Sequence, residues 1–348
     1  MTNGLLKKYK YGINELPTYK TSILLSVITT ILGVGVLIVA KHPALQSVSI
    51  ISIIGILSAV LISFTIQPLI FNFFIGWRTS KGLAPIQLRT YIHSIILFSI
   101  YGLGAMILSL LSITIFPLIP ISKKKKMKWL HGAISKLVTV VLYGNPFIKK
   151  KIINPHHETF EKPAVIIANH SSFIDTLTIG MVTPNIIYLV NDWVYKSPIF
   201  GVLARVVGFF PVSSGVDGNL DRLKEKINQG YCLVVFPEAR RSFTNKIGRF
   251  HKGAFFLAEQ LELDILPLYL HGNAEVIPKR DFVIYDGSLT VKIGERIKFN
   301  DTSFGVSARE KTKNISAFYK DKFNTLRNEI EQVGYFEGVL LSNYRYKG

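Results

Sequence analysis

Long uncharged stretches separated by short polar segments fill the first third of the chain. Residues 21–40 and 48–66 carry no charged side chain. Each is about 20 residues long, enough for an α-helix to cross the hydrocarbon core of a bilayer. Lys41, His42 and Pro43 separate them, so together they predict a hairpin of two membrane-spanning helices. We interpret this hairpin as an anchor, because proton-driven transport needs ionisable residues inside the membrane and these stretches contain none.

A third apolar stretch, residues 92–121, is longer than one straight crossing requires, since a helix of this length would extend about 45 Å. Arg89 precedes it and five lysines lie within residues 123–128, and basic residues on both sides disfavour a crossing. Gly102 and Gly104 lie near its middle, and Pro117 and Pro120 lie near its end. We therefore expect a re-entrant or monotopic helical hairpin that enters the cytoplasmic leaflet and returns. The alternative is a tilted third span.

The remainder of the chain alternates short apolar runs with amphipathic segments, which is typical of an α/β layered domain. Strands are expected at residues 164–168, 186–190, 206–212, 232–236, 265–270, 282–285 and 289–293. Helices are expected at residues 172–182, 194–203, 218–228, 252–260 and 307–333. Residues 129–142 form one apolar helical stripe, which suits either the membrane interface or packing on the α/β domain, and residues 145–161 resemble a linker. The predicted fold is a mixed sheet with flanking helices after an N-terminal α-helical membrane region.

Charge is distributed unevenly over the 348 residues, whose formal net charge is +19. Residues 1–157 hold 17 Lys and Arg residues and one acidic residue, Glu15, for a net charge of +16. The basic half is also the apolar half, so an anionic membrane surface is a better partner than nucleic acid. Cys232 is the only cysteine, which excludes an internal disulfide and suits a small core residue.

Lys and Arg placement also predicts the orientation of the hairpin. Basic residues precede and follow it, at Lys7, Lys8, Lys10, Lys20, Arg78, Lys81 and Arg89. Both of its ends are therefore expected in the cytoplasm. A third crossing would carry the α/β domain to the other side, whereas a re-entrant hairpin keeps it cytoplasmic. The predicted location is the inner, cytoplasmic membrane, with the α/β domain on the cytoplasmic side.

Candidate chemistry lies just past the first predicted strand of the α/β domain. His170 follows the apolar run 164–167, and Asp175 comes five residues later. Strand ends carry the sites of α/β proteins, and histidine can accept a proton near neutral pH. A nearby carboxylate can fix the imidazole tautomer and stabilise the imidazolium. Ser171 and Ser172 suit a helix N-cap, so the competing interpretation is a capping turn with a surface histidine.

A second strand-end motif decides between these interpretations. Phe-Pro-Glu-Ala-Arg-Arg-Ser at residues 236–242 follows the predicted strand 232–236. Together with Asn-His-Ser-Ser-Phe-Ile-Asp at residues 169–175, it resembles the glycerolipid acyltransferases of the lysophosphatidic acid acyltransferase family. The resemblance covers about residues 120–300. It implies a membrane-bound O-acyltransferase that moves a fatty acyl group from acyl-CoA or acyl carrier protein to a lysophospholipid, such as 1-acyl-glycerol-3-phosphate.

The same resemblance implies residue roles. His170 would be the general base and Asp175 the residue that orients it. Glu238 and Arg241 match the residues that bind the glycerol and phosphate of the acceptor; the competing interpretation is a surface salt bridge. The candidate substrate-binding residues are Asn169, Glu238, Arg240, Arg241 and Ser242. No cofactor or metal is implied, and the pair His156 and His157 lacks a third ligand at a recognisable spacing.

Two positions depart from the family pattern. Ala239 stands where glycine is common, and alanine restricts the turn if that position needs a positive φ. Ser214 stands where the family usually has a phosphate-binding arginine, and Arg240 is an additional cation. A phosphate-bearing acceptor is therefore less secure than the reaction class. A lysophospholipid with another head group, or an N-acyl amino-acid lipid, fits as well.

The N-terminal hairpin has a resemblance of its own. Residues 18–76 resemble the last two membrane helices of the lipid-exporter branch of the resistance-nodulation-division transporters. This implies a remnant of a fused transporter, with a transporter or methyltransferase module encoded nearby as a candidate partner. The alternative function is then a non-enzymatic, lipid-binding module of an export assembly. We expect four parts, at residues 1–90, 91–150, 151–300 and 301–348, and residues 335–348 suggest the edge of a longer fusion.

Overall fold

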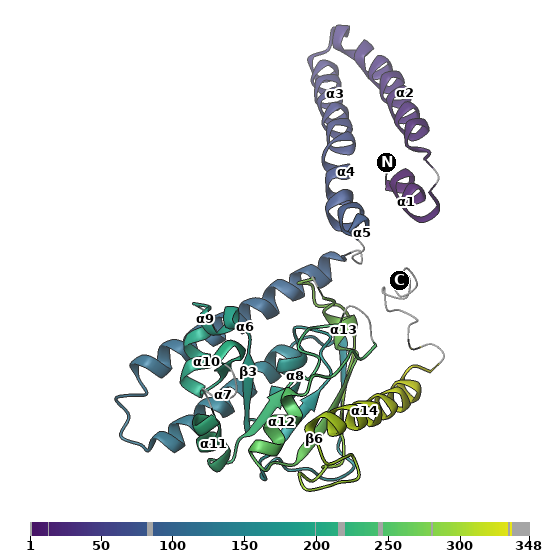
Figure 1. The fold of residues 1–348 in the computed structure, drawn as a ribbon. Helices are drawn as coiled ribbons and strands as arrows, with labels where there is room; N and C mark the ends of the chain where they lie inside the picture. The colour runs from purple at the N-terminus through teal and green to yellow at the C-terminus, as the bar shows by residue number, and fades with distance from the viewer. Residues whose placement is uncertain are drawn as a thin grey trace. The chain divides into compact units, whose positions relative to one another are not determined.

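The computed structural model divides the chain into two compact units, which are described separately (Figure 1). It describes residues 2–12, 14–81, 86–198, 200–214, 220–242, 246–279, 281–332 and 335. The first unit contains Met1–Gln87, and the second begins at Leu88. The second unit brings together the predicted segments 91–150 and 151–300 with the described part of segment 301–348. The suggested fusion edge lies almost entirely outside the described residues.

Helices make up the first unit. They are α1 (Thr2–Tyr11), α2 (Leu16–Gly35), η1 (Val36–Val39), α3 (Pro43–Phe64), α4 (Ile66–Phe71), η2 (Asn72–Gly76) and α5 (Trp77–Ser80). Leu16–Val39 and Pro43–Gly76 are long and apolar enough to cross a membrane. The turn between them is capped by His42, and Ser49 Oγ donates to Val34 O across α2 and α3 at 2.7 Å. The predicted helical hairpin is therefore present.

The third apolar stretch forms one continuous helix, α6 (Leu88–Thr114), instead of turning back at its glycines. It is also long and apolar enough to cross a membrane. Gly104 does not break the helix, because its role is close packing: a Cβ there would lie 2.5 Å from Leu137 Cδ1 of α7 (Lys123–Tyr143). The chain turns after Thr114, and Ser122 caps the start of α7. The prediction of a hairpin within residues 92–121 was wrong in the position of its turn.

A seven-stranded mixed sheet forms the centre of the second unit. Its strands are β1 (Ile148–Ile153), β2 (Val165–Ala168), β3 (Ile186–Val190), β4 (Phe210–Pro211), β5 (Cys232–Val235), β6 (Ile265–His271) and β7 (Gly287–Ile293). The order is β1-β7-β6-β2-β5-β3-β4. Strands β6, β2, β5, β3 and β4 run parallel, whereas β7 is antiparallel to β6. The carboxyl ends of β2, β5 and β6 therefore meet at one edge. The expected mixed sheet is confirmed.

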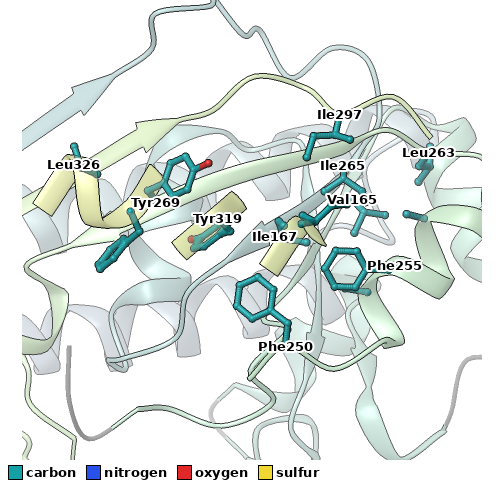
Figure 2. Packing of buried hydrophobic residues seen from close by; sticks show 14 of the residues in the cluster. Val165, Ile167, Phe250, Phe255, Leu263, Ile265, Tyr269, Ile297, Tyr319 and Leu326 are labelled. Carbon is teal, nitrogen blue, oxygen red and sulfur yellow. The ribbon is translucent and has the colours of Figure 1, made fainter. Parts of the chain in front are cut away.

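Helices cover both faces of this sheet (Figure 1). The remaining helices are α8 (Asp175–Val182), α9 (Asp192–Lys196), α10 (Gly201–Val207), η3 (Val212–Ser214), α11 (Leu220–Asn228), α12 (Gly253–Gln260), α13 (Asn273–Val276) and α14 (Ala308–Ile330). Val165 and Ile167 point to the face that is packed by Phe255 of α12 and Tyr319 of α14 (Figure 2). Ile166 packs on the opposite face with residues of α8. Alternate residues of β2 are thus buried on both faces, as expected for a central parallel strand.

Four local predictions differ from the structure, each for an identifiable reason. The expected strand 206–212 is the end of α10, a left-handed Gly208 with φ of 83°, and the short β4. Pro198 separates α9 from α10, where one helix was expected. Residues 283–285 are buried and Phe282 is exposed, and none of them joins the sheet; Ile284 N bonds to Ser94 Oγ of α6 instead. The expected linker 145–161 contains edge strand β1, whose lysines masked the strand pattern.

Candidate active site

The turn after β2 brings the predicted histidine and aspartate into contact. His170 lies two residues past β2, and Asp175 begins α8. His170 Nδ1 and Asp175 Oδ2 are 2.8 Å apart, which is a hydrogen-bond distance. The imidazole ring stacks on Phe236 at a centroid distance of 4.2 Å, and 20% of the side chain remains exposed. Of the two ring nitrogens, only Nδ1 has a hydrogen-bond partner among the described residues. The other, Nε2, is left for a substrate.

Asp175 is fully buried and is held by a set of donors from the protein. Its Oδ2 accepts hydrogen bonds from the backbone N–H groups of Ser171 (2.7 Å) and Ser172 (2.8 Å) as well as facing the imidazole. Its Oδ1 accepts a hydrogen bond from Asn273 Nδ2 at 2.8 Å. A buried carboxylate requires such partners, because unpaired burial of charge is unfavourable. These donors fix the carboxylate in place and in orientation.

Glu238 holds the backbone of His170 by a hydrogen bond. β2 and β5 are neighbours, so the turns that follow them meet at the sheet edge. Glu238 Oε1 accepts a hydrogen bond from His170 N at 2.8 Å, and Oε2 accepts one from Gly248 N at 2.7 Å. Ser242 N donates to His170 O at 2.8 Å, so the peptide groups of His170 are held on both sides. Burial raises the pKa of Glu238, and the two backbone hydrogen bonds offset part of that increase.

Asn169 ties the same turn to β6 and α14. Its side-chain amide donates to Leu270 O and accepts from Leu270 N, both at 2.9 Å. Tyr319 OH accepts from Asn169 N at 2.9 Å, and its one proton lies between two acceptors, Leu268 O at 2.6 Å and Asn169 Oδ1 at 2.9 Å. Tyr319 lies in the cluster between the sheet and α14 (Figure 2). These contacts suit a turn-positioning role for Asn169, and because Asn169 also lines the cavity next to His170, its substrate contact stays a prediction.

A small open cavity adjoins the histidine. Its empty volume is about 330 Å³. The described residues that line it are Asn169, His170, Ser171, Glu238, Ser242, Lys246, Ile247, Leu270, His271, Gly272, Ala274 and Phe323. Most of the predicted site residues therefore share one cavity. Arg240 and Arg241 are not in this lining: Arg240 is exposed, and Arg241 is half-buried with its carbonyl oxygen bound by Lys279.

The two departures from the family pattern have different outcomes. Ala239 has a φ of 58°, so the turn after β5 does need the left-handed conformation that glycine adopts more readily. The strain that the sequence suggested is present. Ser214 closes η3, but its side chain lies outside the described residues. Within the described part of the chain no cluster of His, Cys, Asp or Glu could hold a metal ion.

Part of the chain is similar to known acyltransferases. Residues 148–271 match the acyltransferase family model. A chloroplastic 1-acyl-sn-glycerol-3-phosphate acyltransferase of Brassica napus is 26% identical over 212 residues, 58% of this chain and 61% of that protein. Enzymes of the same name from Saccharomyces cerevisiae and Pseudomonas aeruginosa are 27% and 25% identical, over 51% and 58% of this chain and 59% and 79% of their own lengths. Over these residues the chain is therefore similar to acyltransferases.

The fold of this acyltransferase-like chain also has a solved counterpart. The crystal structure of the 1-acyl-sn-glycerophosphate acyltransferase from Thermotoga maritima superposes with a TM-score of 0.57 at 20% identity, covering 69% of this chain and 97% of that one. At this identity the likeness concerns the fold alone. The chain spans 61% of the Brassica relative and 55% of a second, from Arabidopsis thaliana. The transporter resemblance of residues 18–76 lies outside the family match and stays a prediction.

Sequence reasoning missed several residues of the site. Asn273, Lys246 and His271 were not named, although Asn273 bonds to Asp175 and the other two line the cavity. Two of them could have been found from the sequence. His271 and Asn273 come directly after the predicted strand 265–270, just as His170 comes after the predicted strand 164–168. Lys246 comes from the loop after β5, which has no pattern to reveal its direction.

Proposed function

We propose that this protein transfers a fatty acyl group from an acyl thioester, acyl-CoA or acyl carrier protein, to the hydroxyl of a lysophospholipid such as 1-acyl-glycerol-3-phosphate. The acceptor class comes from the relatives, which are named 1-acyl-sn-glycerol-3-phosphate acyltransferases. The observation that carries the proposal is the 2.8 Å contact between His170 and a fully buried Asp175, beside an open cavity.

The hydrogen bonds around Asp175 decide the tautomer of His170. Oδ2 of an ionised Asp175 can only accept, so His170 Nδ1 must carry the proton that lies between them. Nε2 then has a lone pair, as a general base requires. The tautomer is therefore set by contacts within the protein before any substrate binds.

The reaction follows from this arrangement. Nε2 takes the proton of the acceptor hydroxyl while that oxygen attacks the thioester carbonyl carbon. The tetrahedral intermediate collapses, the carbon–sulfur bond breaks, and the imidazolium returns the proton to the departing thiolate. Asp175 stabilises the imidazolium between these steps. General-base catalysis of this kind contributes about 10²–10⁴-fold.

A covalent acyl-serine is not needed and is disfavoured by the site. Ser172 is fully buried, and its Oγ donates to Ile277 O at 2.7 Å. Ser171 lines the cavity, but among the described residues its hydroxyl makes no hydrogen bond to His170 that would activate it. Direct attack by the acceptor hydroxyl therefore fits the site better than a two-step route.

The acceptor head group is proposed to lie on the side of the cavity formed by the turn after β5. Ser242 and Lys246 line the cavity there. Arg241 and Arg240 follow the same strand, and the resemblance assigns the anion contact to Arg241, with Arg240 in place of the missing second cation. Arg240 would have to turn inward from its exposed position to do so. Lys246 is a competing anion ligand from within the cavity. Glu238 would contribute mainly through its hold on His170.

Acyl transfer can be tested directly. Membranes containing the protein are incubated with labelled acyl-CoA or acyl carrier protein and a panel of lysolipids that differ in head group, with His170→Ala as the matched control. We expect a diacyl product from 1-acyl-glycerol-3-phosphate in the wild type and none above background in the variant. A variant that retains turnover would contradict the general-base role.

A non-phosphate acceptor, such as an N-acyl amino-acid lipid, is a second candidate. The described cavity lining contains Lys246 but neither Arg240 nor Arg241. With fewer cations next to the histidine, a doubly charged phosphate is less well matched than a carboxylate or an uncharged head group. The same panel decides, because a preference for the uncharged or carboxylate head groups would replace the lysophospholipid as acceptor. A lipid-export module without enzymatic activity is less favoured, since it would have no need for a buried, oriented His–Asp pair.

The apolar helices are consistent with membrane association, and we propose that the α/β unit lies on the cytoplasmic face of the inner membrane. Single-cysteine labelling tests this. Burial raises the pKa of Cys232 to about 11, so that thiol should stay unlabelled in the folded protein. A cysteine at Ser122 should be protected from external reagent to the same extent as one at Ser80. External labelling at residue 122 alone would establish a third crossing through α6.

A further inference from the structure

Asn273 approaches the catalytic pair from a strand that neither sequence motif includes. It is the first residue of α13, directly after β6, and is 1% exposed. Its Nδ2 donates to Asp175 Oδ1 at 2.8 Å and to Thr178 Oγ1 of α8 at 3.1 Å. One amide therefore joins the carboxyl end of β6 to the first turns of α8.

The direction of this amide is fixed by chemistry. Asp175 Oδ1 can only accept, so the nitrogen of Asn273 must face it. The amide oxygen is then buried without a hydrogen-bond partner among the described residues. A buried unpaired carbonyl is unfavourable by about 1–3 kcal/mol. An apolar residue would avoid this cost, so the donated hydrogen bond offers a reason for asparagine here.

The backbone before Asn273 has little freedom to place it elsewhere. Gly272 has a φ of 89°, and a Cβ at this residue would lie 1.6 Å from the carbonyl oxygen of Ser288 in β7. Only glycine fits this approach. The close contact between Gly272 and β7 therefore sets where α13 begins and where Asn273 points.

We propose that Asn273 is a positioning residue for acyl transfer, which holds the carboxylate of Asp175 from behind so that Oδ2 stays aligned with His170. The backbone N–H groups of Ser171 and Ser172 and the imidazole all meet Oδ2, so they constrain one oxygen. Asn273 constrains the other and prevents the carboxylate from rotating. This inference rests on the proposed function for its role in turnover, but its effect on His170 can be measured without substrate.

Three variants separate this role from simple packing. Asn273→Ala removes the donor. Thr178→Val is the matched control, because it removes the other acceptor of the same amide and leaves Asp175 untouched. Asn273→Asp keeps the shape and places a second carboxyl group against Asp175. At lower pH two carboxyl groups in contact share one proton and carry a single negative charge. At higher pH the second carboxyl group ionises, and two negative charges then lie on the Nδ1 side of His170.

The first readout is the pH dependence with which diethyl pyrocarbonate modifies His170, followed by mass spectrometry of its peptide in the full-length protein. The reagent attacks neutral imidazole, so the midpoint reports the protonation of His170. Other ionisable groups near the site are Glu238, Tyr319, His271 and Lys246, and they are unchanged in all variants. Asn273→Asp should raise the midpoint by about one pH unit over the range in which both carboxyl groups are ionised, since only then is negative charge added behind His170. Thr178→Val should not move it.

The second readout is turnover with acyl-CoA and 1-acyl-glycerol-3-phosphate. Asn273→Ala should lower kcat by about tenfold to a hundredfold through misalignment, with KM changed less than about threefold, while Thr178→Val stays near wild type. Equal losses in the two variants, together with an unchanged midpoint in Asn273→Asp, would overturn the proposal. If the wild type fails to use these substrates, the proposed function fails, and the modification midpoints alone then decide whether Asn273 acts on the pair.

Discussion

Replacing Asp175 by asparagine should separate catalysis from folding. Asp175 Oδ2 accepts from two backbone N–H groups, so the amide oxygen of the variant has to take that position. Its NH₂ group then faces Asn273, whose amide can turn over and accept. His170 Nδ1 still meets an oxygen and keeps its tautomer. Asp175→Asn therefore removes a charge while keeping the geometry, which distinguishes it from Asp175→Ala.

The size of the effect follows from the contact distance. At 2.8 Å, an imidazolium and a carboxylate attract each other by about 6 kcal/mol at an effective dielectric constant of about 20. A neutral amide oxygen recovers part of this attraction. We therefore expect kcat to fall by about 10²–10⁴-fold, which corresponds to about 3–5 kcal/mol. The free energy of unfolding should fall by less than about 2 kcal/mol, because the donors around residue 175 keep acceptors.

The assay is acyl transfer at saturating donor, with thermal unfolding measured on the same preparation. Asp264→Asn is the matched control. Asp264 is also buried, pairs with Lys162 at 2.8 Å, and precedes β6 at the opposite end of the sheet. This control should lose stability and keep its specific activity. If Asp175→Asn retained more than about a tenth of wild-type kcat, the charge of Asp175 would not stabilise the transition state as argued.

Three further predictions concern stability and the acceptor. Burial lowers the pKa of His131 to about 4. Its contribution to the free energy of unfolding is therefore present above pH 6.5, and about 3 kcal/mol of it is lost as the pH falls to 4. His131→Gln should remove this loss from a series of denaturant titrations over that pH range. Gly272→Ala should cost more than about 3 kcal/mol by denaturant titration, because its Cβ would collide with Ser288. Arg241→Ala and Lys246→Ala should each weaken acceptor use by about tenfold or more, read as KM for the lysolipid.

Controls for the last two of these are available in the chain. Gly230 has a φ of 96° but open space around it, so Gly230→Ala should cost much less than Gly272→Ala. Lys149→Ala removes an exposed lysine from β1 and should leave acceptor use unchanged. If Lys246→Ala keeps the wild-type KM for the acceptor, the arginines bind the anion. If Arg241→Ala keeps it, Lys246 binds the anion.

The centre of the site was accessible from the sequence because its parts are local. His170 and Asp175 belong to one turn, and Glu238 follows a strand that an apolar run announces. The positive φ of Ala239 was raised as a possibility from the sequence, because alanine there stands where the related pattern has glycine. Such features depend on spacing along the chain, which the sequence records directly.

Contacts between distant segments were not accessible in this way. Asn273 and Tyr319 reach the turn after β2 across separations of 98 and 150 residues. Their positions depend on the strand order, in which β6 lies beside β2. The single helix α6 was missed because a glycine at a close helix contact and a glycine at a turn look the same in a sequence; only the proximity of Leu137 to Gly104 distinguishes them.

The two-sided clamp on the peptide groups of His170 has a consequence for selectivity. His170 N is bound by Glu238, and His170 O is bound by Ser242 N, so the base and the turn after β5 move as one body. Any acceptor that displaces this turn also displaces the imidazole. A poorly fitting head group would then slow the chemical step as well as bind weakly. Discrimination among lysolipids should accordingly register in the maximal rate, a form of substrate checking that needs no lid and no second site.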